Sequence, residues 1–180
     1  MAVGLFISEN YLKDNTVIDE NVDMQLLLPT IWMAQEQHIQ TALGGALYKD
    51  LQGKVAPVDT LAGNDLILVD NYIAPALLWW CMYEADITLL YKYRNKNVSK
   101  KSSEDAQPLD FKEHRYVRED HKDKAEWWTQ RLIDYLCYNS NLFPQYTNSQ
   151  NDEIRPDAST YSTSLFLGGK KFNNVYKDCE

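Results

Sequence analysis

The chain has few cysteines, and no two of them are close in sequence. Cys81, Cys137 and Cys179 are too few for a disulfide framework, and no pair has the spacing of metal ligands. Cys81 and Cys137 lie in apolar stretches with helical periodicity, where a free thiol behaves as a small hydrophobic side chain. We therefore expect reduced, structural cysteines in a reducing cytoplasm, and no metal or other cofactor.

Positive charge is also scarce. The 180 residues carry 18 Lys and Arg against 26 Asp and Glu, so the formal net charge is −8. This balance argues against general nucleic-acid binding, which needs basic surface to displace counterions. The hydrophobic fraction of 44% is enough to build the core of one ordinary domain.

The sequence lacks a secretory signal and a long membrane-type run. The first residues have no basic region, and their apolar part ends at Ile7. Residues 73–83 are uncharged, but a membrane span needs about 18 or more apolar residues. A span long enough to cross the bilayer would place Glu84 and Asp86 inside it. We expect a core helix here and no membrane contact.

Apolar side chains recur at helical spacing in three long segments. The first covers residues 23–42, with Pro29 marking a kink or a later start, and Gly44 and Gly45 ending it. The second runs from about residue 64 to Arg94, bent at Pro75, and the third follows Pro108. Shorter helices are expected at residues 8–15, capped by Ser8, and 46–52. The predicted fold is mainly α, a small bundle of three main helices plus short ones.

The third segment has the cleanest pattern in the chain. Eight positions follow alternating steps of three and four, which makes one helical stripe. They are Phe111, His114, Arg118, His121, Ala125, Trp128, Leu132 and Tyr135. The stripe is polar before Ala125 and apolar after it, so we expect only its second half to pack firmly in the core. The first half is expected to project or to contact another molecule.

The composition changes after Tyr146. A polar stretch is followed by an alternating segment and by Gly168 and Gly169, which offer a two-residue turn. We therefore divide the chain into a helical domain, residues 1–146, and a C-terminal arm with a strand or hairpin, residues 147–180. A lone hairpin is marginal in water, so the arm needs a partner. The candidate joining residues are Tyr161, Thr163, Leu165, Phe166 and Leu167.

No active-site signature is visible. His114 and His121 lie on one helix face about 10 Å apart, too far to share a metal ion. The glycines of "FLGGKK" lack the spacing of a phosphate-binding loop. Glu84 shares a helix face with Leu77 and Trp80, so it needs a partner if buried, and Arg131 is one candidate. We favour a structural ion pair over a catalytic carboxylate, and we do not expect an enzyme.

Two surfaces stand out as candidate contacts. Adjacent tryptophans on a helix point about 100° apart, so one meets the bundle and the other a second surface. The candidate subunit interface is Trp79, Trp80, Glu84, Trp127 and Trp128. A basic cluster closes the second helix, where it either complements the helix dipole or docks on an acidic partner or packaged DNA. Its members are Lys92, Arg94, Lys96, Lys100 and Lys101.

The order of these segments resembles the head–tail connector (adaptor or ring) proteins of tailed bacteriophages. It is most like those of crAss-like and other Bacteroidetes phages, over about residues 5–146. The strings "IAPALLWW" and "LGGALY" carry most of the likeness. The resemblance implies a helical subunit in a ring, usually of twelve copies, beneath the portal protein. The ring would extend the DNA conduit and present a platform to the next tail or ring protein, and the arm would join neighbours.

The sequence thus predicts a ring-forming structural virion protein at the head–tail interface, assembled in the host cytoplasm. Its expected partners are copies of itself, the portal, adjacent tail or ring proteins, and double-stranded DNA passing without sequence specificity. Within the same biology, the alternative is a tail-completion or terminator protein, which is usually richer in β-sheet. The alternative from another class is a small intracellular helical enzyme or regulator that uses Glu84 or the His114 and His121 face.

Overall fold

A computed structural model describes residues 4–18, 22–56, 60–94, 97–100, 111–147 and 154–156. For residues 87, 89–94, 97–100 and 111 the description is limited to the backbone. The protein is mainly α-helical, as the sequence predicts. The joining residues Tyr161, Thr163, Leu165, Phe166 and Leu167 lie outside the described residues.

Three helical runs form the body of the molecule. The first consists of α2 (Met24–Ala34), the π-helical turn η1 (Gln35–Ile39) and α3 (Gln40–Leu43), and the second of α5 (Asn64–Leu68), the π-helical turn η2 (Val69–Ile73) and α6 (Ala74–Leu90). The third is α7 (Phe111–Tyr138). The shorter elements are α1 (Glu9–Asn15), α4 (Gly45–Val55), β1 (Tyr91–Arg94), β2 (Asn97–Lys100), the 3-10 turn η3 (Ser140–Leu142) and α8 (Pro144–Thr147).

Side-chain caps fix the starts of the first two helices. The Ser8 hydroxyl accepts a hydrogen bond from the backbone N–H of Tyr11 at 3.1 Å, which confirms the predicted cap of α1. The Asp23 carboxylate accepts from the N–H of Gln25 at 2.9 Å, so α2 starts at Met24. Pro29 therefore lies inside α2 and does not delay its start.

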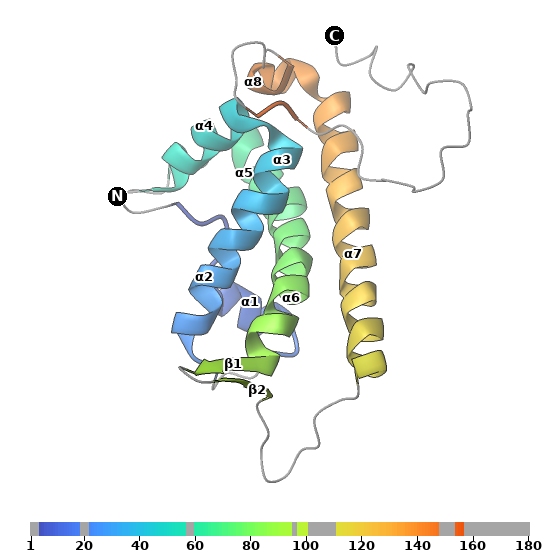
Figure 1. Ribbon diagram of the computed structural model, residues 1–180. Helices are drawn as coiled ribbons and strands as arrows, with labels where there is room; N and C mark the ends of the chain where they lie inside the picture. The colour runs from blue at the N-terminus through green and yellow to red at the C-terminus, as the bar shows by residue number, and fades with distance from the viewer. Residues whose placement is uncertain are drawn as a thin grey trace, which may run out of the picture.

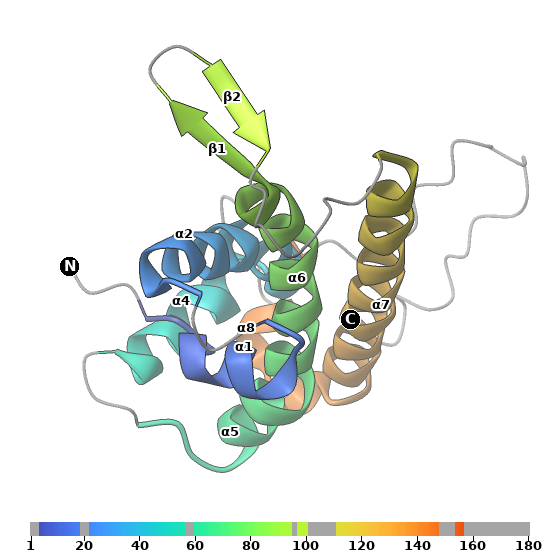
Figure 2. The same ribbon diagram turned by 90° about the horizontal axis from the view of Figure 1, so that it is seen from below.

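Helix α6 lies between α2 and α7 in both perpendicular views (Figures 1 and 2). Its side chains are buried on both sides, which explains its nearly continuous apolar sequence. The core runs along this central helix and includes Leu27, Ile31, Leu43, Leu77, Cys81, Leu132 and Leu136. By length and composition alone, residues Asn64–Asp86 are apolar enough to cross a membrane, a test that the core helix of a soluble protein also passes. Here the segment is used as a core helix.

A π-helical turn, η2, precedes Pro75, where the sequence predicts a bend. Proline lacks an N–H, and its ring clashes with the carbonyl four residues back, here that of Asn71. The wider π-helical turn over Val69–Ile73 contains that carbonyl, with the N–H of Ala74 bonding to the oxygen of Val69. The π-helical turn thus accommodates the proline without breaking the helix.

The corner between α3 and α4 requires a glycine. Gly44 has a φ of 75°, a left-handed conformation that favours glycine, which confirms the predicted helix stop. A Cβ at this position would lie 2.8 Å from Cδ of Pro156. The N–H of Gly45 donates to the carbonyl of Ile154 at 2.9 Å. Residues 154–156, which the sequence assigned to the arm, therefore contact the helical domain.

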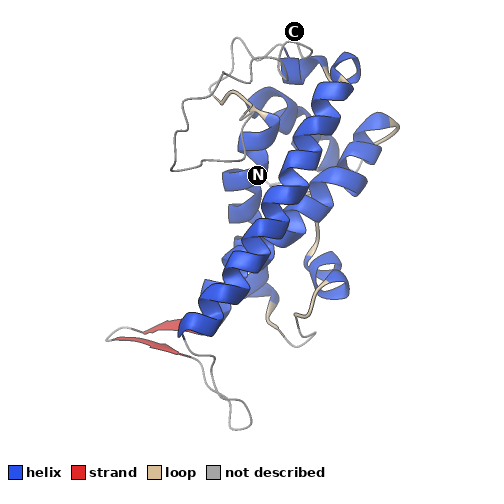
Figure 3. Ribbon diagram, turned by 90° about the vertical axis from the view of Figure 1, so that its right-hand side faces the viewer, coloured by secondary structure: helices blue, strands red, loops and turns tan. Residues whose placement is uncertain are grey.

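The second helix ends earlier than predicted. We expected it to reach Arg94, but α6 ends at Leu90, and the chain continues into an antiparallel hairpin. Tyr91 pairs with Lys100, and Arg94 with Asn97. Tyr-Lys-Tyr-Arg alternates with the two-residue period of a strand, and aromatic residues favour strands. The hairpin projects from one end of the bundle (Figure 3).

The predicted stripe of α7 faces α6. The prediction that only the part of the stripe from Ala125 onward packs within the subunit is wrong. Ala125, Leu132 and Leu136 are buried as expected. The preceding turns also contact α6, through polar side chains. Nδ1 of His121 lies 3.0 Å from Oδ2 of Asp86, and the Arg118 guanidinium lies 4.0 Å from the centre of the Tyr83 ring. The polar half of the stripe therefore packs within the subunit.

Candidate functional site

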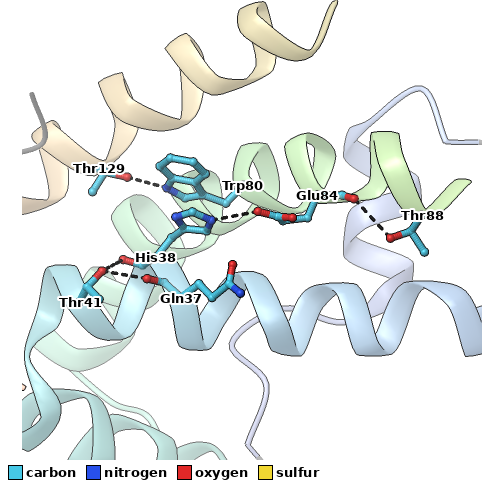
Figure 4. Close-up of polar contacts among 7 residues, drawn as sticks. All are labelled: Gln37, His38, Thr41, Trp80, Glu84, Thr88 and Thr129. Carbon is cyan, nitrogen blue, oxygen red and sulfur yellow. Dashed lines mark hydrogen bonds and ion pairs between the residues drawn. The ribbon is translucent and has the colours of Figure 1, made fainter. Parts of the chain in front are cut away.

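A polar network ties the three long helices together at the middle of the bundle (Figure 4). The His38 ring, from η1, stacks on the ring of Trp80 with 3.6 Å between centroids and 3° between planes. Its Nε2 lies 3.3 Å from Oε1 of Glu84. The indole N–H of Trp80 donates to the hydroxyl of Thr129 on α7 at 2.9 Å. One tryptophan thus links the first helical run to the third.

The network replaces the partner that the sequence suggested for Glu84. Arg131 was the candidate, but Glu84 pairs with His38, which lies 46 residues away. Burial lowers the pKa of His38, and the neighbouring Glu84 carboxylate opposes that shift without cancelling it. The imidazole is therefore neutral at pH 7 and serves as a packed, hydrogen-bonded core group.

Trp79 also finds its contacts within the chain. Its ring centre lies 5.9 Å from that of His121, and the Lys124 ammonium lies 4.6 Å above it. Trp80 is only 7% exposed. Of the five candidate interface residues, Trp79, Trp80 and Glu84 therefore contact other parts of the same chain. Trp128 is half-buried, and Trp127 is 54% exposed.

The outer face of α2 carries large exposed apolar side chains that the sequence analysis did not single out. They are Met24, Leu28, Trp32 and Met33. The buried residues Leu27, Ile31 and Ala34 form the opposite, inward face. The signal was present in "MQLLLPTIWMA", which is apolar all round. A helix of that kind is either buried on every side or in contact with a second surface.

The outer face of α7 forms the second apolar surface. Trp127 and Tyr138 are exposed there, the latter by 90%. Between them in sequence lies the exposed Arg131, whose guanidinium is 5.7 Å from the centre of the Trp127 ring and 5.1 Å from that of Trp128. The buried residues Ala125, Leu132 and Leu136 lie on the inward face.

The described members of the basic cluster lie on the hairpin that follows α6. Lys92, Arg94 and Lys100 lie on β1 and β2, while Lys96 and Lys101 fall outside the described residues. Helix α6 ends at Leu90, so Lys92, Arg94 and Lys100 lie beyond its last residue.

The residues considered for chemistry from the sequence, Glu84, His114 and His121, lie in contacts between helices. Within the described part of the chain, no group of three or more His, Cys, Asp or Glu side chains is placed to hold a metal ion. His114 and His121 both turn toward α6, where Nε2 of His114 lies 3.4 Å from the carbonyl of Asp86. The arrangement of these side chains supports packing between α6 and α7.

Comparison with known proteins gives one family. The model of a family of unknown function, DUF6712, matches residues 39–156. The match begins at the end of η1 and ends at Pro156, the residue that contacts the Gly44 corner. No curated protein matches the chain. No solved structure matches it either.

Proposed function

We propose that this chain, which belongs to the DUF6712 family of unknown function, is a structural virion protein that forms a ring between portal and tail. In this function the ring extends the DNA conduit of a tailed bacteriophage and gives the next tail or ring protein a platform. Each copy acts by contact with its neighbours, and no catalytic chemistry is required.

The observation that carries the proposal is the pair of outer apolar faces on α2 and α7. A subunit in a closed ring needs two non-identical side surfaces, because each copy touches one neighbour with one face and the other neighbour with the other. Trp32 on α2 is 46% exposed and Trp127 on α7 is 54% exposed. Helix α6 lies between these two helices in Figures 1 and 2. Exposed aromatic side chains on opposite flanks fit a head-to-tail ring better than an isolated monomer.

The interior of the bundle supports a rigid building block. His38, Glu84, Trp80 and Thr129 use their polar groups on one another, which fixes the three long helices. A fixed spacing between the α2 and α7 flanks is what a ring of constant diameter requires. The mainly helical fold also favours a connector over a tail-terminator protein, the class expected to be richer in β-sheet.

In this proposal the two ends of the subunit contact different partners. Residues 154–156 lie at the α3–α4 corner, and the hairpin lies at the other end of the bundle (Figure 1). The C-terminal arm, with a strand or hairpin from Tyr161 to Leu167, joins a neighbouring subunit or the portal. The basic hairpin meets an acidic partner. The net charge of −8 suits a duct through which DNA slides without being held.

The test is the mass of the purified chain, measured by analytical ultracentrifugation and native mass spectrometry, alone and with the portal of the same virus. The expected result is one discrete oligomer, about twelve copies, either in solution or on the portal. A chain that stays monomeric with the portal present would contradict the proposal. A stable dimer whose melting temperature rises with a small-molecule substrate would instead support the enzyme alternative.

A further inference from the structure

The two exposed faces are chemically complementary. The segment 24–39 contains no Lys or Arg and a single acid, Glu36, one helical turn after Trp32. Glu36 is partly exposed, and its Oε1 accepts a hydrogen bond from the Tyr48 hydroxyl at 2.7 Å. A carboxylate has about four acceptor positions, so this contact leaves room for a cation. The α2 face is thus an apolar stripe that ends in one carboxylate.

The α7 face offers the matching cation. Arg131 is exposed, and within the described part of the chain it forms no ion pair with a carboxylate. Its contacts are aromatic: the rings of Tyr72, Trp127 and Trp128 lie between 5.1 and 5.8 Å from the guanidinium carbon. Three other cations of the same helix, Arg115, Lys122 and Lys124, each have a carboxylate partner four residues away.

Geometry prevents the two faces from meeting within one molecule. Leu27 and Ile31 turn one side of α2 toward the core, and Leu132 and Leu136 do the same for α7. The exposed sides therefore point away from the bundle, with α6 between the two helices (Figure 2). Within the described part of the chain neither face can reach the other, so each is open to another copy or another protein.

We propose that the α2 face of one copy docks on the α7 face of the next, with Glu36 paired to Arg131 and Trp127 packed against the stripe around Trp32. This inference rests on the proposed ring function and names the contact that closes the ring. A second copy is the occupant because each chain carries both halves. One face has Arg131, which forms no ion pair among the described residues, and the other has Glu36, the single acid of segment 24–39. Arg and Trp are also the residue types that dominate binding energy at protein interfaces. Because the two faces differ, the contact is head-to-tail and repeats around a ring.

Charge reversal tests the contact. Arg131→Glu and Glu36→Lys each place like charges opposite each other, and each is expected to raise the concentration for half-assembly by about tenfold or more. The double variant, Glu36→Lys with Arg131→Glu, restores opposite charges and is expected to assemble near the wild-type concentration. Arg115→Glu is the matched control, since Arg115 lies on another side of α7, and it is expected to leave assembly unchanged. Cooperative thermal unfolding establishes that the variants fold, with a lower melting temperature expected for Glu36→Lys because the buried Tyr48 hydroxyl loses its acceptor.

Mixing the two single variants gives a sharper result. Glu36 of the Arg131→Glu chain meets Arg131 of the Glu36→Lys chain, and the two reversed residues meet at the next contact. An equal mixture is therefore expected to form rings of alternating chains with even copy numbers, at concentrations where neither variant assembles alone. Native mass spectrometry separates these species if one chain carries a mass label.

The outcomes distinguish this contact from the ring function itself. The experiment uses the wild-type assembly, in solution or on the portal. Suppose that wild-type rings form. If Arg131→Glu then forms rings at the wild-type concentration, or if the mixture of the two variants fails to assemble, the proposed contact is wrong but the ring function stands. If Arg131→Glu forms rings but loses portal binding, the α7 face binds portal and the contact is again wrong. If the wild type assembles under neither condition, both proposals fail.

Discussion

The hydrogen bond between Trp80 and Thr129 gives the sharpest test of how the bundle is held together. Thr129→Val keeps the shape of the side chain but removes the acceptor of the indole N–H, which lies 2.9 Å away. Trp80 is 7% exposed and Thr129 5%, so water cannot easily replace the lost partner. An orphaned buried donor costs about 1–3 kcal/mol. We expect the free energy of unfolding to fall by about 2 kcal/mol, within that range.

The assay is chemical and thermal unfolding of the purified chain. For a protein of this size, about 2 kcal/mol corresponds to a fall in melting temperature of about 4–8 °C. Thr41→Val is the control, because the exposed Thr41 hydroxyl donates to the carbonyl of Gln37 just as Thr129 donates to that of Ala125. The Thr41→Val substitution leaves no buried donor unpaired, so it should change the free energy of unfolding by no more than about 0.5 kcal/mol.

A double-mutant cycle with Trp80→Phe isolates the bond. Phenylalanine has no N–H, so Thr129→Val should cost about 1–2 kcal/mol less in the Trp80→Phe background than in the wild type. Equal costs in the two backgrounds would refute the reasoning. So would a Thr129→Val effect no larger than that of Thr41→Val.

Two further predictions concern pH and the corner glycine. Burial lowers the pKa of His38 in the folded chain. Below about pH 6.5 the unfolded chain therefore takes up a proton that the folded chain does not, and the free energy of unfolding decreases as the pH is lowered. The advantage of the wild type over His38→Gln in unfolding free energy should therefore shrink between pH 7.5 and 5; a constant or growing advantage would contradict the assignment. Gly44→Ala should destabilise by about 1–3 kcal/mol, because φ is 75° and the new Cβ would meet Pro156. Gly53→Ala, inside α4 with open space around it, should stabilise by about 0.5–1 kcal/mol. In denaturant titrations, a stabilised Gly44→Ala variant would refute the first prediction, and a destabilised Gly53→Ala variant the second.

Local signals in the sequence were sufficient for much of the fold. Ser8 caps α1 as predicted, because a cap depends on a side chain and a backbone N–H only three residues apart. The glycine stop at Gly44 and the inward stripe of α7 are likewise set by nearest neighbours along the helix. These features need no knowledge of what lies across the bundle.

The site depended on contacts that no local pattern contains. Glu84 pairs with His38 across 46 residues, and nothing near either residue identifies the other. The hairpin had a local signal, the alternation in Tyr91–Arg94, but it directly follows a long helical pattern that predicted continuation. The exposed face of α2 was missed because an all-apolar helix does not show which side the core leaves uncovered.

The central claim is that the chain forms the ring between portal and tail. Electron microscopy of purified particles of the phage proposed to encode it, with protein mass spectrometry of the same particles, tests this most directly. The account predicts a ring of this chain between portal and tail, with the α2 and α7 flanks at the contacts between neighbouring copies. Absence of the chain from the particles would contradict it.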